Sequence, residues 1–166
     1  MPQSAADAVL REAGRGARGR RGEQSARRTQ RETVSALSVV PLFASLSKKH
    51  LERLARETDR QTYAPGVKIV EEGLLGETLF VVLEGRGKIT RGGKKVGEVL
   101  PGDFFGELSA LDGGPRSATI TAVTPVTVLR LFRRTLLGAL KDEPRMAIKL
   151  LDGMAARIRQ VERGTG

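Results

Sequence analysis

The chain has 166 residues, of which 39% are hydrophobic and only 4% aromatic, and its net charge is +10. This length suits one compact domain rather than two, with a core built from Leu, Val, Ile and Ala. The absence of cysteine excludes a disulfide scaffold and a thiolate zinc site and fits a reducing cytoplasm. No apolar run approaches the roughly 18 residues that span a bilayer, and no signal-peptide core is visible, so we expect a cytoplasmic protein.

More than half of the net charge lies near the N-terminus, because residues 11–31 carry eight arginines against two glutamates. Residues 14–31 also contain four glycines and almost no apolar side chains, so they cannot bury enough surface to offset the entropy of ordering. We therefore expect residues 1–33 to be a disordered Arg/Gly-rich tail. Three roles stay open for it: solubilisation, weak contact with nucleic-acid phosphates, and contact with a membrane surface.

Ordered structure is expected from residue 34. Ser47 is a suitable N-cap for a short helix, because Leu51, Leu54 and Ala55 follow it at helical spacing. From about residue 60 to 132 the pattern changes to short β-rich runs, such as "TLFVVL" and "VTVLRL", separated by glycine, proline and charged residues. Strands at intervals of about 8–12 residues are typical of an all-β sandwich or barrel.

A longer helix is predicted after the strands, within residues 133–163. Its apolar residues recur at i, i+3, i+4, i+7, i+11 and i+14 from Ala147, which is one stripe of an amphipathic helix. Pro144 suits its first turn, whereas Gly153 weakens it by about 1 kcal/mol relative to alanine. We interpret the stripe as core, and the sequence leaves open whether it also forms a homodimer.

The stretch "GELSALDGGPRSAT" (106–119) combines features that suit an anion. A short helical turn from Gly106 would present amides that have no intrahelical partner, at the positive end of the helix dipole. Arg116 can return a planar guanidinium to the same place, where it matches phosphate oxygens. Glu107 would repel a phosphate but could accept a hydrogen bond from a ribose hydroxyl. Together these residues indicate a nucleotide.

The stretch "PGDFFGELSALDGGPRSATITA" (101–122) resembles the phosphate-binding cassette of the cyclic nucleotide-binding domain family, and "VEEGLLGETLFVVLEGRGKI" resembles its glycine-spaced β-roll signature. The resemblance covers about residues 39–163. It implies a mainly β fold: an eight-stranded antiparallel β-roll, similar to a jelly roll, with short N-terminal helices and a long C-terminal lid helix. The domain would span residues 34–163, with the β-roll at about 60–132 and the C-terminal helices at about 133–163.

The resemblance also assigns roles to individual residues of the cassette. Gly106, Leu108 and Ser109 would offer backbone amides near the cyclic phosphate, and Glu107 would accept from the ribose 2′-hydroxyl. Arg116 would pair with the exocyclic phosphate oxygens. Ser117 stands where relatives carry alanine for cAMP or threonine for cGMP, so it leaves the base undecided.

The C-terminal lid departs from the family's pattern. Activator proteins place a Thr-Ser pair over the base, whereas "MAARIRQVERG" has Val161 and Glu162 at about those positions. Arg157, Arg159 or Val161 could cap the base instead. The sequence also continues into no DNA-reading domain or kinase, so the regulated effector is expected to be another, unidentified protein chain, a partner that docks on this one, or a missing part of the gene product.

We therefore interpret the chain as a regulatory protein that senses cAMP, or less readily cGMP, and signals by movement of its C-terminal helix. It is predicted to be no enzyme and to hold no metal, because one histidine, no cysteine and no Gly-x-Ser-x-Gly elbow leave no catalytic residues. Two alternatives stay open: a ligand-free β-roll with a nucleic-acid-binding tail, and a fragment of a transcription regulator.

Overall fold

A computed structural model describes residues 5–164, with side chains from residue 19 onward. Five α-helices and one 3-10 helix surround the strands in this range: α1 Ala5–Ser38, η1 Pro41–Phe43, α2 Lys48–Glu57, α3 Glu107–Asp112, α4 Arg133–Asp142 and α5 Pro144–Gly164. The eight strands of the same range are β1 Asp59–Tyr63, β2 Lys68–Val70, β3 Thr78–Glu84, β4 Gly87–Arg91, β5 Lys94–Val99, β6 Phe104–Phe105, β7 Thr119–Ala122 and β8 Val126–Phe132.

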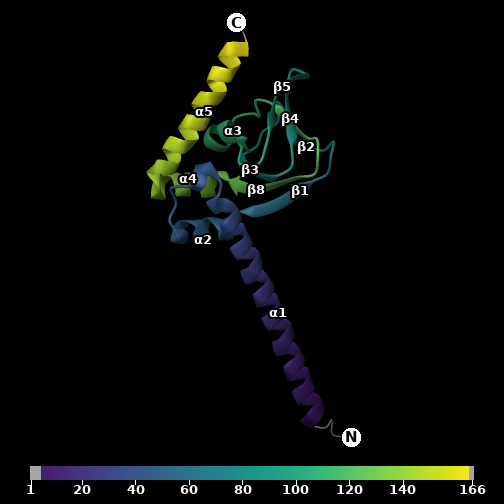
Figure 1. The fold of residues 1–166 in the computed structure, drawn as a ribbon. Helices are drawn as coiled ribbons and strands as arrows, with labels where there is room; N and C mark the ends of the chain where they lie inside the picture. The colour runs from purple at the N-terminus through teal and green to yellow at the C-terminus, as the bar shows by residue number, and fades with distance from the viewer. Residues whose placement is uncertain (1–4, 165–166) are drawn as a thin grey trace.

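The strands form two four-stranded sheets that face each other as a roll, shown in Figure 1. One sheet has the order β1-β8-β3-β6 and the other β2-β7-β4-β5, and every pairing is antiparallel. The prediction of an eight-stranded antiparallel β-roll with flanking helices and a long C-terminal helix is therefore confirmed for the residues that the structure describes.

Strand β8 is buried on both faces and serves two cores. Val126 and Val128 point into the roll, whereas Leu129 and Leu131 belong to the core beneath the helices. This division follows from the period-2 alternation of a strand between two covered surfaces. Strand β3 alternates in the same way, so β3 and β8 each pack against the core of the roll on one face and against the core beneath the helices on the other.

Helix α2 begins where the sequence predicts. Ser47 is its N-cap, and the Ser47 hydroxyl accepts a hydrogen bond from the amide of His50 at 3.3 Å. Leu51, Leu54 and Ala55 are buried against the core. Helix α5 likewise begins at Pro144, which needs no amide partner in the first turn.

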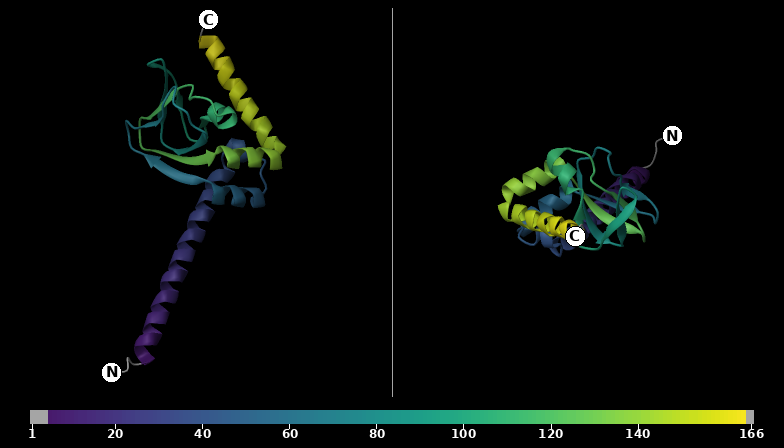
Figure 2. Two further views of the ribbon diagram at one scale, coloured as in Figure 1. Left: turned by 180° about the vertical axis from the view of Figure 1, so that it is seen from behind. Right: turned by 90° about the horizontal axis from the view of Figure 1, so that it is seen from above.

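The predicted disorder of residues 1–33 differs from the structure, in which helix α1 runs from Ala5 to Ser38 and projects from the domain (Figures 1 and 2). Residues 1–4 of the predicted tail lie outside the described residues. Leu37 is buried in the core and Val34 packs against it, so the C-terminal end of α1 is anchored. Arginine, alanine, glutamate and glutamine favour helix, which lets the helix continue beyond this anchor despite its glycines. The short N-terminal helices that we expected are thus one long helix followed by η1 and α2.

Gly153 has a packing role that accounts for a poor helix former within α5. A Cβ atom at this position would lie 2.6 Å from Cζ of Phe104 in β6. The glycine therefore lets α5 approach the aromatic ring closely, and this contact sets the distance between α5 and the roll.

None of the helices within residues 5–164 is both long enough and apolar enough to cross a membrane.

Candidate functional site

Arg116 is the centre of the site, although it is a charged residue with only 8% of its surface exposed. Its Nη1 donates to the carbonyl oxygen of Thr78 at 2.8 Å, to that of Gly106 at 3.2 Å and to the hydroxyl of Ser109 at 2.5 Å. The guanidinium carbon also lies 5.6 Å from the centre of the Phe80 ring. One buried cation thus fastens together β3, the start of α3 and the loop that precedes β7.

Gly106 allows this arrangement because of its backbone conformation and its lack of a side chain. It caps α3 with a φ of +79°, in the left-handed region that favours glycine. A Cβ atom there would lie 2.6 Å from Nη1 of Arg116 and 2.7 Å from the carbonyl oxygen of Thr78. The predicted short helical turn after Gly106 is present as α3, and its first amides are those that lack an intrahelical acceptor.

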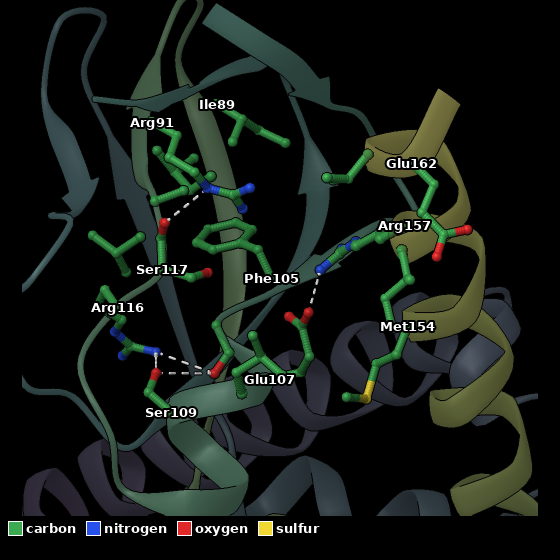
Figure 3. A pocket seen from close by; sticks show the side chains of 17 residues that line it. Ile89, Arg91, Phe105, Glu107, Ser109, Arg116, Ser117, Met154, Arg157 and Glu162 are labelled. Carbon is green, nitrogen blue, oxygen red and sulfur yellow. Dashed lines mark hydrogen bonds and ion pairs between the residues drawn. The ribbon is translucent and has the colours of Figure 1, made fainter. Parts of the chain in front are cut away.

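Glu107 is buried to 7% exposure and pairs with the C-terminal helix rather than with Arg116. Nη1 of Arg157 donates to Oε1 of Glu107 at 2.7 Å, and the guanidinium carbon of Arg157 lies 4.8 Å from the centre of the Phe104 ring. Figure 3 shows Arg157 reaching from α5 across the opening of the pocket to this carboxylate. The ion pair links α5 to the first turn of α3.

These residues surround a pocket of about 370 Å³ between the roll, α3 and α5. The pocket lining includes all six predicted cassette residues: Gly106, Glu107, Leu108, Ser109, Arg116 and Ser117. Of the three predicted lid residues, Arg157 and Val161 line the pocket, whereas Arg159 is exposed and lies outside its lining. Helical geometry explains the difference, because a residue two positions from Arg157 points about 200° away around the helix.

The structure also brings in residues that the sequence interpretation missed. Arg91 of β4 donates through Nε to the carbonyl oxygen of Ser117 at 3.1 Å, which places a second cation beside the cassette (Figure 3). The opposite wall is apolar and comes from the two sheets and α5; it includes Val70, Ile89, Phe105, Ile120, Met154 and Ile158. No local motif marks these residues, because they meet only through the closure of the roll and the docking of α5.

The electrostatics of the site favour an anionic ligand. Burial lowers the pKa of the Arg116 guanidinium below its ordinary value, and the nearby carboxylate of Glu107 partly offsets this effect. A buried cation of this kind gains from a negatively charged partner that replaces its lost hydration. Within the part of the chain that the structure describes, no group of three or more His, Asp or Glu side chains could hold a metal ion.

Comparisons with known proteins agree with this geometry. A family model described as the cyclic nucleotide-binding domain matches residues 60–143. The cyclic AMP receptor protein of Thermus thermophilus is 34% identical over 127 residues, which make up 74% of this chain and 59% of that protein. The cAMP-dependent protein kinase regulatory subunit of Aspergillus fumigatus is 35% identical over 128 residues, or 74% of this chain and 31% of that protein.

A likeness to solved structures points the same way. The crystal structure of the Thermus thermophilus catabolite activator protein superposes with a TM-score of 0.67 at 32% identity. The match covers 75% of this chain and 61% of that one. The chain therefore spans less than two thirds of the length of each of these relatives.

Substitution of Gly106 tests how tightly the site is built. In Gly106→Ala the left-handed backbone costs roughly 1–2 kcal/mol, and the clash with the Thr78 carbonyl adds about 1–3 kcal/mol. Gly93→Ala is the matched control, because Gly93 has a φ of +78° but a Cβ atom there would meet no other atom within 4 Å. Urea unfolding should show the larger loss of stability for Gly106→Ala. Equal losses in the two variants would contradict the packing described for the site.

Proposed function

Because the chain belongs to the cyclic nucleotide-binding domain family, we propose that it is a regulatory domain that binds cAMP, with cGMP as the alternative, in the pocket between α3 and α5. The observation that carries this proposal is the buried, preorganised Arg116 beside the open first turn of α3. The names of the Thermus thermophilus and Aspergillus fumigatus relatives describe cAMP-responsive proteins, which favours cAMP.

The cyclic phosphate would bind at the α3 end of the pocket. The amides of Gly106, Leu108 and Ser109 supply donors at the positive end of a helix dipole. Nη1 of Arg116 makes the three protein contacts, while Nε and Nη2 have no partner among the described residues and can serve the exocyclic oxygens. Gly76 keeps this side of the guanidinium clear, since a Cβ there would lie 2.6 Å from both nitrogens.

The ribose would bind to Glu107. An ionised carboxylate has two oxygens with about four acceptor sites, and Arg157 uses only Oε1. Oε2 can therefore accept from a 2′-hydroxyl while the ion pair to α5 persists. The ligand and the C-terminal helix would then share one carboxylate.

The base would lie toward the apolar wall, where Val70 and Ile89 face Met154 and Ile158 of α5. The hydroxyl of Ser117 lies at the pocket and can donate or accept, so it accommodates either adenine or guanine. Arg157 and Val161 are the lid candidates that reach the pocket, and Arg157 also contacts Phe104.

Signalling would pass through the Glu107–Arg157 ion pair. A ligand that neutralises and orders the cassette favours the conformers in which α5 lies against the roll, shifting an existing equilibrium. An effector that contacts α5 would respond to the position of this helix.

The stripe of α5 that we expected to be core is only partly buried, because Leu150 is buried whereas Leu151, Ile158 and Val161 are 50–61% exposed. We propose in addition that α5 forms a homodimer seam. Ile148, Leu151, Ala155 and Ile158 follow the alternating spacing of three and four residues that defines a coiled-coil seam, and the three large side chains are about 60% exposed. Two copies of the chain would pair along these four residues.

Ligand binding through Arg116 is tested by thermal unfolding with cAMP, cGMP, AMP and ATP. A cyclic nucleotide at 100 times its Kd should add about 2.7 kcal/mol, a midpoint rise of roughly 5–11 °C for a domain of this size. Arg116→Ala should lose this rise, measured against its own unliganded midpoint, and Arg116→Lys should lose most of it because lysine lacks the bidentate fork. Arg56→Ala is the control, because it removes the same charge from an exposed position on α2, and it should retain the ligand-induced rise in the unfolding midpoint. No response of the wild type would favour the ligand-free interaction domain.

The coupling role of Arg157 is tested by amide hydrogen exchange over residues 154–162. In the wild type, ligand should slow exchange there by about 5- to 150-fold, the range that corresponds to typical coupling free energies. In Arg157→Gln the ligand should still bind but protect α5 far less, because the link to Glu107 is gone. Arg159→Gln is the control, since Arg159 lies outside the pocket lining. Equal protection in both variants would refute the coupling.

The dimer is tested by light scattering coupled to size-exclusion chromatography. The wild type should elute at twice the chain mass of 17.9 kDa, and Leu151→Lys should elute at the monomer mass because it places a charge in the seam. Leu74→Lys changes an equally exposed leucine away from α5 and should leave the dimer intact. A monomeric wild type would refute the seam.

A further inference from the structure

Helix α1 carries a row of arginines on the face that it turns toward the domain. At 100° per residue, Arg20, Arg27 and Arg31 lie within about 40° of one another around the helix, and close to Val34. Val34 packs against the core and the next turn is held by buried Leu37. The row is therefore fixed in direction by the anchored end of the helix.

The row leads into a groove between α1 and α2. This groove of about 490 Å³ is lined by Arg27, Arg31 and Val34 of α1 and by Lys48 and Glu52 of α2, together with Gln30 and Ser35. Glu52 is the one acidic residue of the lining, and its carboxylate lies 4.0 Å from Nζ of Lys48. Arg27 and Arg31 form no ion pair with any residue that the structure describes. Three cations thus converge on one concave surface with a single partly compensating charge.

The basic residues of α1 and α2 are not placed where they would stabilise the helices. Lys48 and Lys49 occupy the first turn of α2, at the positive end of its dipole, where acidic residues would be favourable. Gly19 and Gly22 each cost α1 up to about 1 kcal/mol relative to alanine, and α1 is polar around most of its exposed circumference. A polyanion along the row would relieve the i,i+4 repulsion between Arg27 and Arg31 and stabilise the helix.

We propose that the basic row of α1 and the α1–α2 groove bind the phosphate backbone of duplex nucleic acid. Guanidinium groups on a straight helix, about 6 Å apart along the axis for Arg27 and Arg31, suit a rigid array of phosphates. This proposal is independent of the proposed cyclic nucleotide pocket, because no residue of α1 or α2 belongs to the lining of that pocket. Figure 1 shows α1 projecting away from α3 and α5.

The composition of the surface separates duplex nucleic acid from other polyanions. Residues 19–58 contain one Phe, Tyr or Trp side chain, Phe43, and it is fully buried, so this surface offers single-stranded bases no ring of this kind to stack on. Within residues 19–58, Val39 is the only large apolar side chain that is exposed. One valine is too small an apolar surface to anchor a helix in a membrane or to form the hydrophobic centre of a protein interface.

The test is fluorescence anisotropy of a labelled 20-base-pair duplex as a function of salt. The wild type should bind with an affinity that falls linearly with the logarithm of salt concentration, by about 0.9 per phosphate contact. In Arg20→Gln/Arg27→Gln/Arg31→Gln the slope should decrease by up to about 2.7, which at 0.1 M salt corresponds to as much as roughly 500-fold weaker binding. Because the three side chains are exposed or lie at the rim of the groove, this variant should fold like the wild type, and its unfolding midpoint checks that it does.

The charge-matched control is Lys94→Gln/Lys149→Gln/Arg163→Gln, which removes three exposed cations from β5 and α5. It should keep the wild-type slope. Equal slopes in the two triple variants, or no duplex binding by the wild type, would overturn the proposal. Equal or tighter binding to polyglutamate, or to vesicles of phosphatidylcholine and phosphatidylglycerol in a 7:3 ratio, would also overturn it, in favour of an acidic protein or a membrane surface.

Discussion

The burial of one guanidinium organises this domain. Arg116 contacts a carbonyl of β3, the cap of α3 and a hydroxyl within α3, so its hydrogen bonds close the loop between β6 and β7 around a cation. Removing an arginine from water is unfavourable unless its donors are satisfied, and here the protein satisfies one nitrogen completely. The glycines at 76 and 106 leave room for this cation, because a side chain at either would collide with it.

A second cation extends the same site to the C-terminal helix. Arg157 contacts both the carboxylate of Glu107 and the ring of Phe104, while Gly153, one turn earlier on α5, leaves room for that ring. The position of α5 therefore depends on side chains of α3 and β6 that border the pocket. An occupant that changes the environment of Glu107 can act on α5 through these two contacts, in addition to touching the α5 side chains that line the pocket, which gives the proposed regulation a specific physical route.

The sequence predicted the features that depend on local patterns. The β-rich runs, the cap at Ser47, the start of α5 at Pro144 and the turn after Gly106 all follow from propensity and spacing, and the structure confirms them. It also indicated which residues of the cassette meet in one pocket. The missed features depend on tertiary contacts: Arg91 reaches Ser117 only because β4 pairs with β7, and Arg159 lies outside the pocket only because α5 docks through Arg157. The N-terminal segment was expected to be disordered because its composition offers no core, whereas the anchor of the helix, Leu37, lies beyond residues 1–33.

The most direct test of the central claim is an amide-resolved NMR titration of the 15N-labelled chain with cAMP and, separately, with 5′-AMP. We expect the largest shift changes with cAMP at the amides of Gly106, Leu108 and Ser109 and at the side chain of Arg116, and much smaller changes with 5′-AMP at equal concentration. Unchanged cassette amides at saturating cAMP, or equal changes with both nucleotides, would contradict the assignment of this pocket as a cyclic phosphate site.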